Sequence, residues 1–451
     1  MGDRKLEFKK KSDAILKLAG KLADEVLISL SSTVNSLTRF GENEITQNVT
    51  LATGGTGITL VRDQKSTKIQ TDCLEPEKLK PLLLKASEIL KYQKKDPDYP
   101  NFPKQIKFDQ SGSCYSDKTA RNSPKDRAEL VISHIRRCES EKLLGSGIVS
   151  TNETRLAIAN SKGLFAYHET TGSNFSTTVM DDKGHSGWAT GSNVDISRLD
   201  WETVSRTAIE KSKLNRKPRD LEVGEYPVIL EPAAVTDMLL FLSYKAFATQ
   251  AYQEGRSPLQ GKLGKKIMSK NLTILDDPFD PLNPGLPFDF EGIKRQGLTL
   301  VDKGIFKELP IDLKLSKKMG KPSTGHGLDY PNPMGPFCLN LRIPPGKRSL
   351  AEIIRDSDKC LLITHFHYTN IINPNDLTIT GTTRDGLYWI EKGKIAYPVK
   401  NMRLTESVFR ALNLVEEISS EQVFESAFFG GGFIVPSMKL SGFKFTSKTD
   451  Y

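Results

Sequence analysis

The chain has 451 residues, of which 37% are hydrophobic and 26% are charged, and its formal net charge is +9. This composition is typical of a soluble globular protein with two or three domains. Basic residues are mixed with acidic ones both at the N-terminus and between Lys91 and Arg137, which excludes a purely basic tail and favours a solvated surface over a nucleic-acid surface.

The cysteines and the absence of long apolar runs indicate the compartment. The five cysteines are widely spaced and show no zinc or redox pair, as expected for reduced thiols in a cytosolic protein. The N-terminus lacks an apolar signal-peptide core, and no apolar run approaches the roughly 20 residues of a membrane span. We therefore expect a cytoplasmic protein with no membrane partner.

Helices and antiparallel strands alternate in the first half of the chain. One-sided apolar spacing predicts a helix over residues 8–31, and Thr-rich text with Gly and Asn predicts strands over 31–72. Within the latter, "ATGGTGITL" is predicted to be a hairpin because a strand, not a helix, follows it. Further along we predict helices at 75–93 (Pro76 in the first turn), 123–142 (Ser123 as cap) and 200–214, a surface loop at 94–124 and strands at 147–180.

The second half is predicted to be rich in strands. A strand at 226–231 precedes a helix from Pro232 to Gly255, whose middle is apolar on nearly every side and is therefore expected to be buried. A late helix is predicted over 405–419, with Thr405 as its cap. The predicted class is α+β, with two domains at 1–220 and 221–451, each a mainly antiparallel or mixed β-sheet with a few helices.

Common catalytic signatures are absent from the sequence. "GRSPLQGKLGKK" fails the phosphate-loop pattern by one residue of spacing and by Leu263 where Ser or Thr is required. There is no helical zinc motif and no nucleophile elbow. The acidic residues Asp276, Asp277, Asp280 and Asp289 lie beside Pro and Gly, so we interpret them as turn residues rather than as a metal site.

Several blocks of the sequence resemble the TldD/PmbA family, once called modulators of DNA gyrase. In the second half these are "VILEPAAV", "EGRSPLQGKLGKKIMSKNLTILDDP", "FDFEGIKRQGLTLVDKGIFKELPID", "STGHG" and "TGTTRDGLYWIEKGKIAYPVKNMRLTESV". In the first half "LTRFGENEITQNV" and "IANSKGLFAYHETTGSN" resemble the family's N-terminal domain. The resemblance covers nearly the whole chain, and its specificity lies in the order and spacing of the blocks.

The resemblance implies a cytoplasmic proteolytic assembly of two related subunits around a cavity. The TldD-like subunit carries H-E-x-x-x-H on the buried helix and a later cysteine; these hold zinc, and the glutamate is the general base. Zinc chemistry of this kind lowers the pKa of bound water to about 7 and polarises the peptide carbonyl.

This sequence departs from the zinc motif. The helix from Pro232 to Ala251 contains no His or Glu, and without gaps the motif positions fall at Leu240, Phe241 and Lys245. No cysteine follows Cys360. The chain therefore resembles the PmbA-like (TldE-like) partner, which implies no cofactor in this chain and zinc in the partner subunit.

A histidine pair in "LLITHFHYTN" is the remaining candidate site. His365 and His367 are predicted to leave one face of a strand, with Phe366 on the other. Three interpretations stay open: two histidines on a sheet, a peptide-contacting surface that also uses Tyr368 and Asn370, or a replacement metal site. A metal site needs a third ligand, for which His326 and Asp385 are candidates by residue type.

Three functions compete at this point. The first is a non-catalytic subunit that pairs with a TldD-like catalytic subunit, or with itself as a homodimer, and acts on unfolded peptides or small proteins. The second is a metallopeptidase with a metal relocated to His365 and His367. The third is a non-enzymatic binding module acting on a DNA-linked protein, although nucleic acid itself is not an expected partner because the charge excess is mild.

Overall fold

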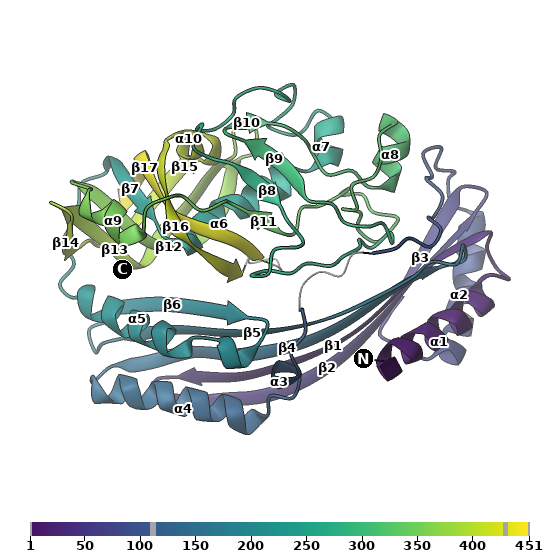
Figure 1. The fold of residues 1–451 in the computed structure, drawn as a ribbon, viewed down its shortest axis with the longest axis horizontal. Coiled ribbons are helices and arrows are strands. Elements are labelled where there is room, and N and C mark those ends of the chain that lie inside the picture. Colours follow the sequence, from purple (N-terminus) through teal and green to yellow (C-terminus); the bar gives the residue numbers. More distant parts are fainter. Residues whose placement is uncertain (1, 109–113, 427–431, 450–451) are drawn as a thin grey trace.

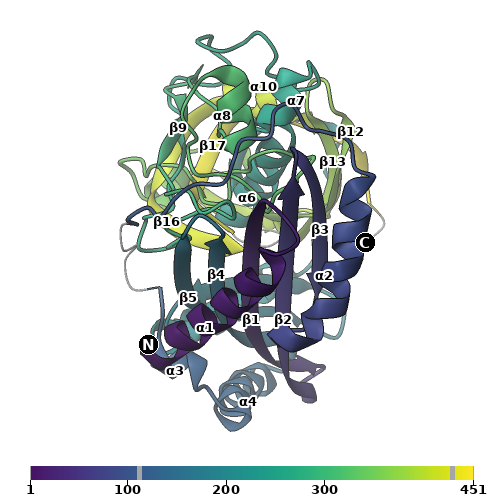
Figure 2. The same cartoon turned by 90° about the vertical axis from the view of Figure 1, so that its right-hand side faces the viewer.

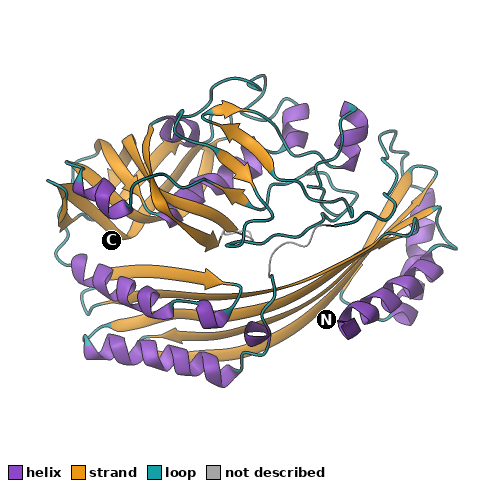
Figure 3. Cartoon of the chain, in the orientation of Figure 1, coloured by secondary structure: helices purple, strands orange, loops and turns teal. Residues whose placement is uncertain are grey.

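The computed structural model describes residues 2–108, 114–426 and 432–449. Strands from the first half form a six-stranded sheet, and strands from the second half form an eleven-stranded sheet. The second half lies over one face of the long first sheet, and helices line the other face (Figure 1, Figure 3). The predicted α+β class with antiparallel and mixed sheets is confirmed. No helix among the described residues is long and apolar enough to cross a membrane.

The first sheet is wholly antiparallel and has the strand order β3-β2-β1-β4-β5-β6. Two tight turns, Glu42–Asn43 and Asp63–Gln64, join its first three strands, and all four turn residues have positive φ. Such two-residue turns match the twist of an antiparallel pair. The strands are β1 (Glu25–Gly41), β2 (Glu44–Arg62), β3 (Lys65–Thr71), β4 (Leu144–Asn160), β5 (Phe165–Met180) and β6 (Ser186–Asn193).

Two predictions for this region are wrong. The helix expected over 8–31 is α1 (Gly2–Ala19), and residues from Glu25 onwards belong to β1. "ATGGTGITL" is not a hairpin but the middle of β2. Its glycines serve close packing: a Cβ on Gly57 would lie 2.4 Å from the Ser29 hydroxyl oxygen.

Helices of the first half cover one face of the sheet, where they bury two apolar clusters. α1 and α2 lie side by side at one end (Figure 2), and α4 and α5 lie at the other. The predicted cap of α4 is confirmed, because Ser123 and Asp126 form a reciprocal capping box. The helices are α2 (Pro76–Lys91), α3 (Asp117–Ala120), α4 (Pro124–Ser140), α5 (Trp201–Leu214) and the short 3₁₀ turn η1 (Ile196–Arg198).

The segment predicted as a surface loop at 94–124 is only partly one. Tyr99 and Phe102 are buried, α3 lies within the segment, and residues 109–113 fall outside the described part of the chain. Its aromatic residues pack in an apolar cluster with Tyr330 of the second half, so this loop helps to join the two halves.

The second sheet closes on itself. Strands β17, β15, β13, β12 and β7 follow one another, and β7 also pairs with β17. The strands are β7 (Gly224–Leu230), β8 (Ile274–Asp276), β9 (Leu298–Asp302), β10 (Ile305–Phe306), β11 (Leu341–Arg342), β12 (Cys360–Asn373), β13 (Thr378–Glu391), β14 (Lys394–Pro398), β15 (Met402–Ser407), β16 (Val415–Ser426) and β17 (Gly432–Lys448). The short helices α8 (Leu313–Met319), α9 (Leu350–Arg355) and α10 (Val408–Asn413) lie between them.

Two helices of the second half differ from the prediction. The expected helix from Pro232 to Gly255 is divided into α6 (Pro232–Phe241), a π-helical turn η2 (Leu242–Ala246) and α7 (Thr249–Gln253). The expected helix over 405–419 is reduced to α10, whose cap is Ser407 rather than Thr405, because the flanking residues pair with β17 as β15 and β16. Long-range strand pairing therefore overrides the local helical pattern there.

Candidate functional site

A polar contact joins the two halves of the chain at one end of the first sheet. Ser186 of β6 donates its hydroxyl to Asp385 Oδ1 at 2.6 Å, and His365 Nε2 of β12 lies 2.9 Å from Asp385 Oδ2. The ring of Trp188 lies 4.6 Å from the ring of His365, centroid to centroid. The carboxylate of Asp385 therefore contacts both Ser186 of the first sheet and His365 of the second sheet.

The backbone conformation at Asp385 directs its side chain towards Ser186 and His365. Asp385 has φ of 55°, a left-handed conformation that Asp tolerates better than most residues, and Gly386 follows with φ of 144°. The pairing of β12 with β13 shifts register next to it, between Ile363 and His365. Burial opposes ionisation of Asp385, but His365 and Ser186 outweigh it and lower the pKa of this carboxyl.

Asp237 of α6 lies behind this contact. Burial raises the pKa of its carboxyl to about 7, although the neighbouring His365 and the backbone N–H of Phe366 favour the ionised form. A carboxyl of this kind holds a proton near neutral pH and can donate or accept a hydrogen bond.

A second perturbed carboxyl, Glu425 of β16, faces the same region. Burial raises its pKa to about 8, Lys211 of α5 opposes this rise, and Glu231 and Asp237 add to it. Lys211 itself forms an ion pair with Glu231. We call Lys211, Glu231, Asp237 and Glu425 the interdomain carboxyl cluster; its members come from both halves of the chain.

A cavity of about 380 Å³ lies between the first sheet and the second half. Asn152, Thr170 and Asn174 line it from the sheet, and Asn283 and Phe424 line it from the second half. Its described lining carries amides and hydroxyls but no charged side chain. Its volume lies in the range of ligand sites, and its chemistry suits an uncharged polar chain such as an extended peptide backbone.

The four residues of the predicted histidine site separate in the structure. Only His365 joins the interdomain contact. His367 lies within 2.9 Å of the guanidinium of Arg384, and burial together with this positive charge lowers its pKa. Tyr368 is 87% exposed, and the Asn370 side chain accepts from the backbone N–H of Ile371. A peptide-contacting role of these residues stays a prediction.

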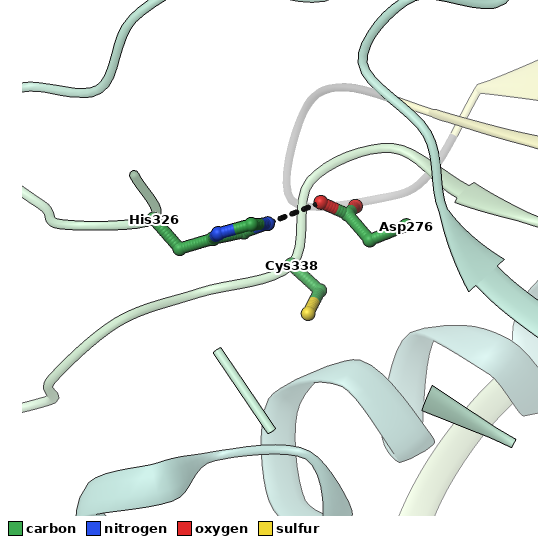
Figure 4. Close-up of side chains that lie close together, drawn as sticks. All are labelled: Asp276, His326 and Cys338. Atoms are coloured by element: carbon green, nitrogen blue, oxygen red, sulfur yellow. Dashed lines mark hydrogen bonds and ion pairs between the residues drawn. The ribbon is translucent and has the colours of Figure 1, made fainter. Parts of the chain in front are cut away.

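One group of three potential metal ligands occurs among the described residues: Asp276, His326 and Cys338, whose ligand atoms lie within 4.8 Å of one another (Figure 4). All three side chains are buried. His326 Nε2 lies 2.7 Å from Asp276 Oδ2. The sequence suggests His326 as a third metal ligand beside His365 and His367. In the structure His326 contacts Asp276 instead.

The chemistry of this group does not fit a metal. Arg295 Nη2 lies 2.5 Å from the same Asp276 oxygen, so a guanidinium already neutralises the carboxylate. Burial opposes ionisation of Asp276, but Arg295 and His326 overcome it and lower its pKa to about 2. Burial raises the pKa of the Cys338 thiol, which disfavours the thiolate that zinc requires. We interpret the group as a buried ion-pair network that orders the loops of the second half.

The positions expected for the family's zinc motif also lack ligands. Leu240 and Phe241, at the end of α6, are 7% and 8% exposed and belong to the main apolar cluster. Lys245, in the π-helical turn, has its ammonium 4.5 Å from the centroid of the Tyr244 ring. Neither an apolar side chain nor a cation can hold zinc or act as general base.

Sequence reasoning missed Ser186, Asp237 and Glu425. A signal existed for Asp237, which is the only charged residue in the apolar helix "PAAVTDMLLF". A charge in a helix that is apolar all round is rarely buried unless it has a partner. Ser186 and Glu425 gave no such signal, since each lies in an ordinary alternating strand.

Comparisons with known proteins agree with this architecture. Residues 223–447 match the model of the PmbA/TldA metallopeptidase C-terminal domain, and residues 117–216 match that of the PmbA/TldA metallopeptidase central domain. The metalloprotease PmbA of Escherichia coli O157:H7 is 23% identical over 447 residues, 95% of this chain and 94% of that protein. A zinc metalloprotease TldD homolog of Saccharolobus solfataricus is 27% identical over 220 residues, 46% of each chain.

The fold is also found in solved structures. The crystal structure of TldE from Thermococcus kodakarensis superposes with a TM-score of 0.88 at 24% sequence identity, covering 97% of this chain and 100% of that one. The two family models together span most of the chain, from residue 117 to residue 447. The chain therefore belongs to the PmbA/TldD metallopeptidase family.

Proposed function

We propose that this chain is the non-catalytic, PmbA/TldE-like subunit of a cytoplasmic TldD/PmbA-type metalloprotease that acts on unfolded peptides or small proteins. Its partner is a TldD-like chain that carries H-E-x-x-x-H and binds the zinc. This chain completes the assembly and contributes to the space in which substrate is held.

One observation carries the proposal: helix α6 has Leu240 and Phe241 where zinc ligand and general base are expected, and both side chains are packed in the core. A catalytic zinc needs three protein ligands and an open position for water. Among the described residues, the one other group of potential ligands is Asp276, His326 and Cys338. Arg295 already forms an ion pair with the Asp276 carboxylate there.

The cavity supports the proposed contribution to substrate binding. Its amide and hydroxyl lining can bond to peptide backbone without selecting for charge.

The test compares three samples: this chain alone, a TldD-like chain alone, and the two mixed. Metal analysis of this chain alone should find no stoichiometric zinc, and an unstructured casein-type peptide should stay intact. The mixture should bind zinc and cut the peptide faster than the TldD-like chain does by itself. Zinc-dependent cleavage by the isolated chain would overturn the proposal, as would a mixture no more active than the catalytic chain alone.

The same metal analysis addresses the histidine alternative. A metal held at His365 and His367 should be lost in a His367→Ala variant and kept in a Tyr368→Ala control, whose side chain is exposed beside it. If the wild-type protein holds no metal, the hypothesis of a metal site at His365 and His367 is excluded.

A further inference from the structure

The uncharged lining of the cavity continues across the first sheet. Leu27 and Leu156 pack in one apolar cluster with Phe288 of the second half, so residues in phase with them share the face turned towards that half (Figure 1). In the middle of four strands these residues are Ser29, Ser31, Thr33, Asn35 and Leu37 of β1, Val49, Leu51, Thr53, Gly55 and Gly57 of β2, Ser150, Asn152 and Thr154 of β4, and His168, Thr170, Gly172 and Asn174 of β5. None of them is Asp, Glu, Lys or Arg, and we call this set the uncharged face.

Charged residues do occur on the same strands, but they point to the opposite face, which the helices cover. Glu153 and Arg155 of β4 alternate with residues of the uncharged face and form an ion pair at 2.5 Å. Arg4 of α1 lies 2.8 Å from the same carboxylate. The strands therefore accept charge where a partner is within reach, and the restriction belongs to one face rather than to the strands as a whole.

His168 of β5 is the only residue of the uncharged face that titrates near neutral pH. Burial lowers the pKa of its imidazole to about 4, and its Nε2 atom has no hydrogen-bond partner among the described residues. The neutral form therefore dominates at physiological pH. The face thus carries no formal charge under the conditions in which a ligand would meet it.

The cavity lies at the β5 and β6 end of the uncharged face. Asn152, Thr170, Gly172 and Asn174 belong to both the face and the cavity lining. The Asn152 amide lies over Gly172, where a Cβ would come within 3.0 Å of Asn152 Nδ2. Within the described part of the chain this amide has no hydrogen-bond partner, so it is free to bond to a ligand.

A ligand held between this face and the second half loses part of its hydration. Neutral polar groups recover hydrogen bonds from the hydroxyls and amides of the lining. A charged side chain of either sign loses more hydration and finds no opposite charge in the described lining to compensate for the loss. The lining therefore disfavours acidic and basic side chains alike.

We propose that the cavity selects peptide segments without charged side chains, and that Asn152 is one of the residues that determine this specificity. The inference rests on the proposed function for the identity of the ligand as a peptide, and it deepens that function by defining the class of peptide. The net charge of +9 alone predicts a different preference, for acidic peptides over basic ones.

Isothermal titration calorimetry with the isolated chain tests the selectivity, because residues of this chain line the cavity from both sides. The probes are three end-blocked peptides of Ser, Thr, Gln and Ala that differ only at a central Ser, Lys or Asp. The Lys and Asp peptides should each bind about tenfold or more weakly than the Ser peptide, and the difference should persist in about 0.5 M NaCl. Charged peptides that bind as tightly as the Ser peptide, a preference for one sign that salt removes, or no binding of any peptide would overturn the inference.

A charge placed in the cavity tests the role of Asn152. Asn152→Asp keeps the shape of the side chain, and the ratio of dissociation constants, Asp peptide over Lys peptide, should rise about tenfold or more above that of wild type. Asn375→Asp is the matched control, since it adds the same charge at an exposed position in the turn between β12 and β13, outside the cavity lining. Asn152 is itself exposed, so both variants should melt like wild type. The same ratio in the two variants contradicts the inference.

These measurements need neither zinc nor a TldD-like chain, so they fail separately from the proposed function. If the chain prefers the Ser peptide but does not speed cleavage by a TldD-like chain, the selectivity stands and the subunit role is refuted. If it speeds cleavage but binds all three peptides equally, the subunit role stands and the selectivity is refuted.

Discussion

Replacing Glu425 by glutamine should make the protein more stable at alkaline pH. The carboxyl of Glu425 has its pKa raised from 4.5 to about 8, mainly by burial. A carboxyl with a raised pKa stabilises the folded state only while it is protonated. Its contribution is therefore fully present below about pH 4.5 and is lost as the pH rises through about 8.

The size of the effect follows from the pKa shift. One pKa unit corresponds to 1.36 kcal/mol, so raising the pKa from 4.5 to about 8 costs the fully ionised folded state about 5 kcal/mol. Roughly half of that cost falls between about pH 6 and pH 8.5. Asp237, with its pKa raised to about 7, changes stability in the same direction, so the wild-type protein should lose stability over this interval.

Chemical denaturation at several pH values measures this directly. Glu425→Gln keeps the shape of the side chain and removes the charge, so the variant should exceed wild type at about pH 8.5 by about 2 kcal/mol or more and show a flatter pH profile. Glu416→Gln, an exposed position on the same strand, is the matched control and should follow wild type. A Glu425→Gln variant that is less stable than wild type at every pH would show that the carboxylate makes an essential ionised contact.

Three further changes test the rest of the structure. Arg295→Met should cost about 3–5 kcal/mol in denaturation, because it leaves the carboxylate of Asp276 buried without its cation, while the exposed control Arg355→Met should change stability by no more than about 0.5 kcal/mol. Asp385→Asn should lower stability by about 1.5–3 kcal/mol by weakening the contact between the two halves, and a thermal melt unchanged from wild type would show that this contact is not needed. The triple change Leu240→His, Phe241→Glu and Lys245→His should melt lower, gain no stability from added zinc and cut no peptide, since each buried polar group without a partner costs on the order of 1–3 kcal/mol; zinc-dependent stabilisation with cleavage would refute this.

The parts of the fold that were predictable are those fixed by neighbouring residues. The start of α4 follows from Ser123 and Asp126, which satisfy each other's hydrogen bonds within a single turn, and from Pro124 in the first helical position. Glycines at 54, 55 and 57 misled the prediction because glycine marks both turns and close packing. Here Gly55 and Gly57 permit close approach of serines on β1, and Gly54 permits close approach of Leu74. The same limit applies to the segment around Val408, where pairing with a distant strand decides the structure.

The candidate site shows a similar division. His365 stood out because its neighbours form an alternating strand, and Asp385 could be named by residue type. Ser186, which bonds to Asp385, and Glu425, which lies near Lys211 and Asp237, come from strands whose register with the rest of the fold cannot be deduced from local sequence. His365 and His367 lie in one unbroken stretch of strand register, but their surroundings differ, since one faces a carboxylate and the other a guanidinium.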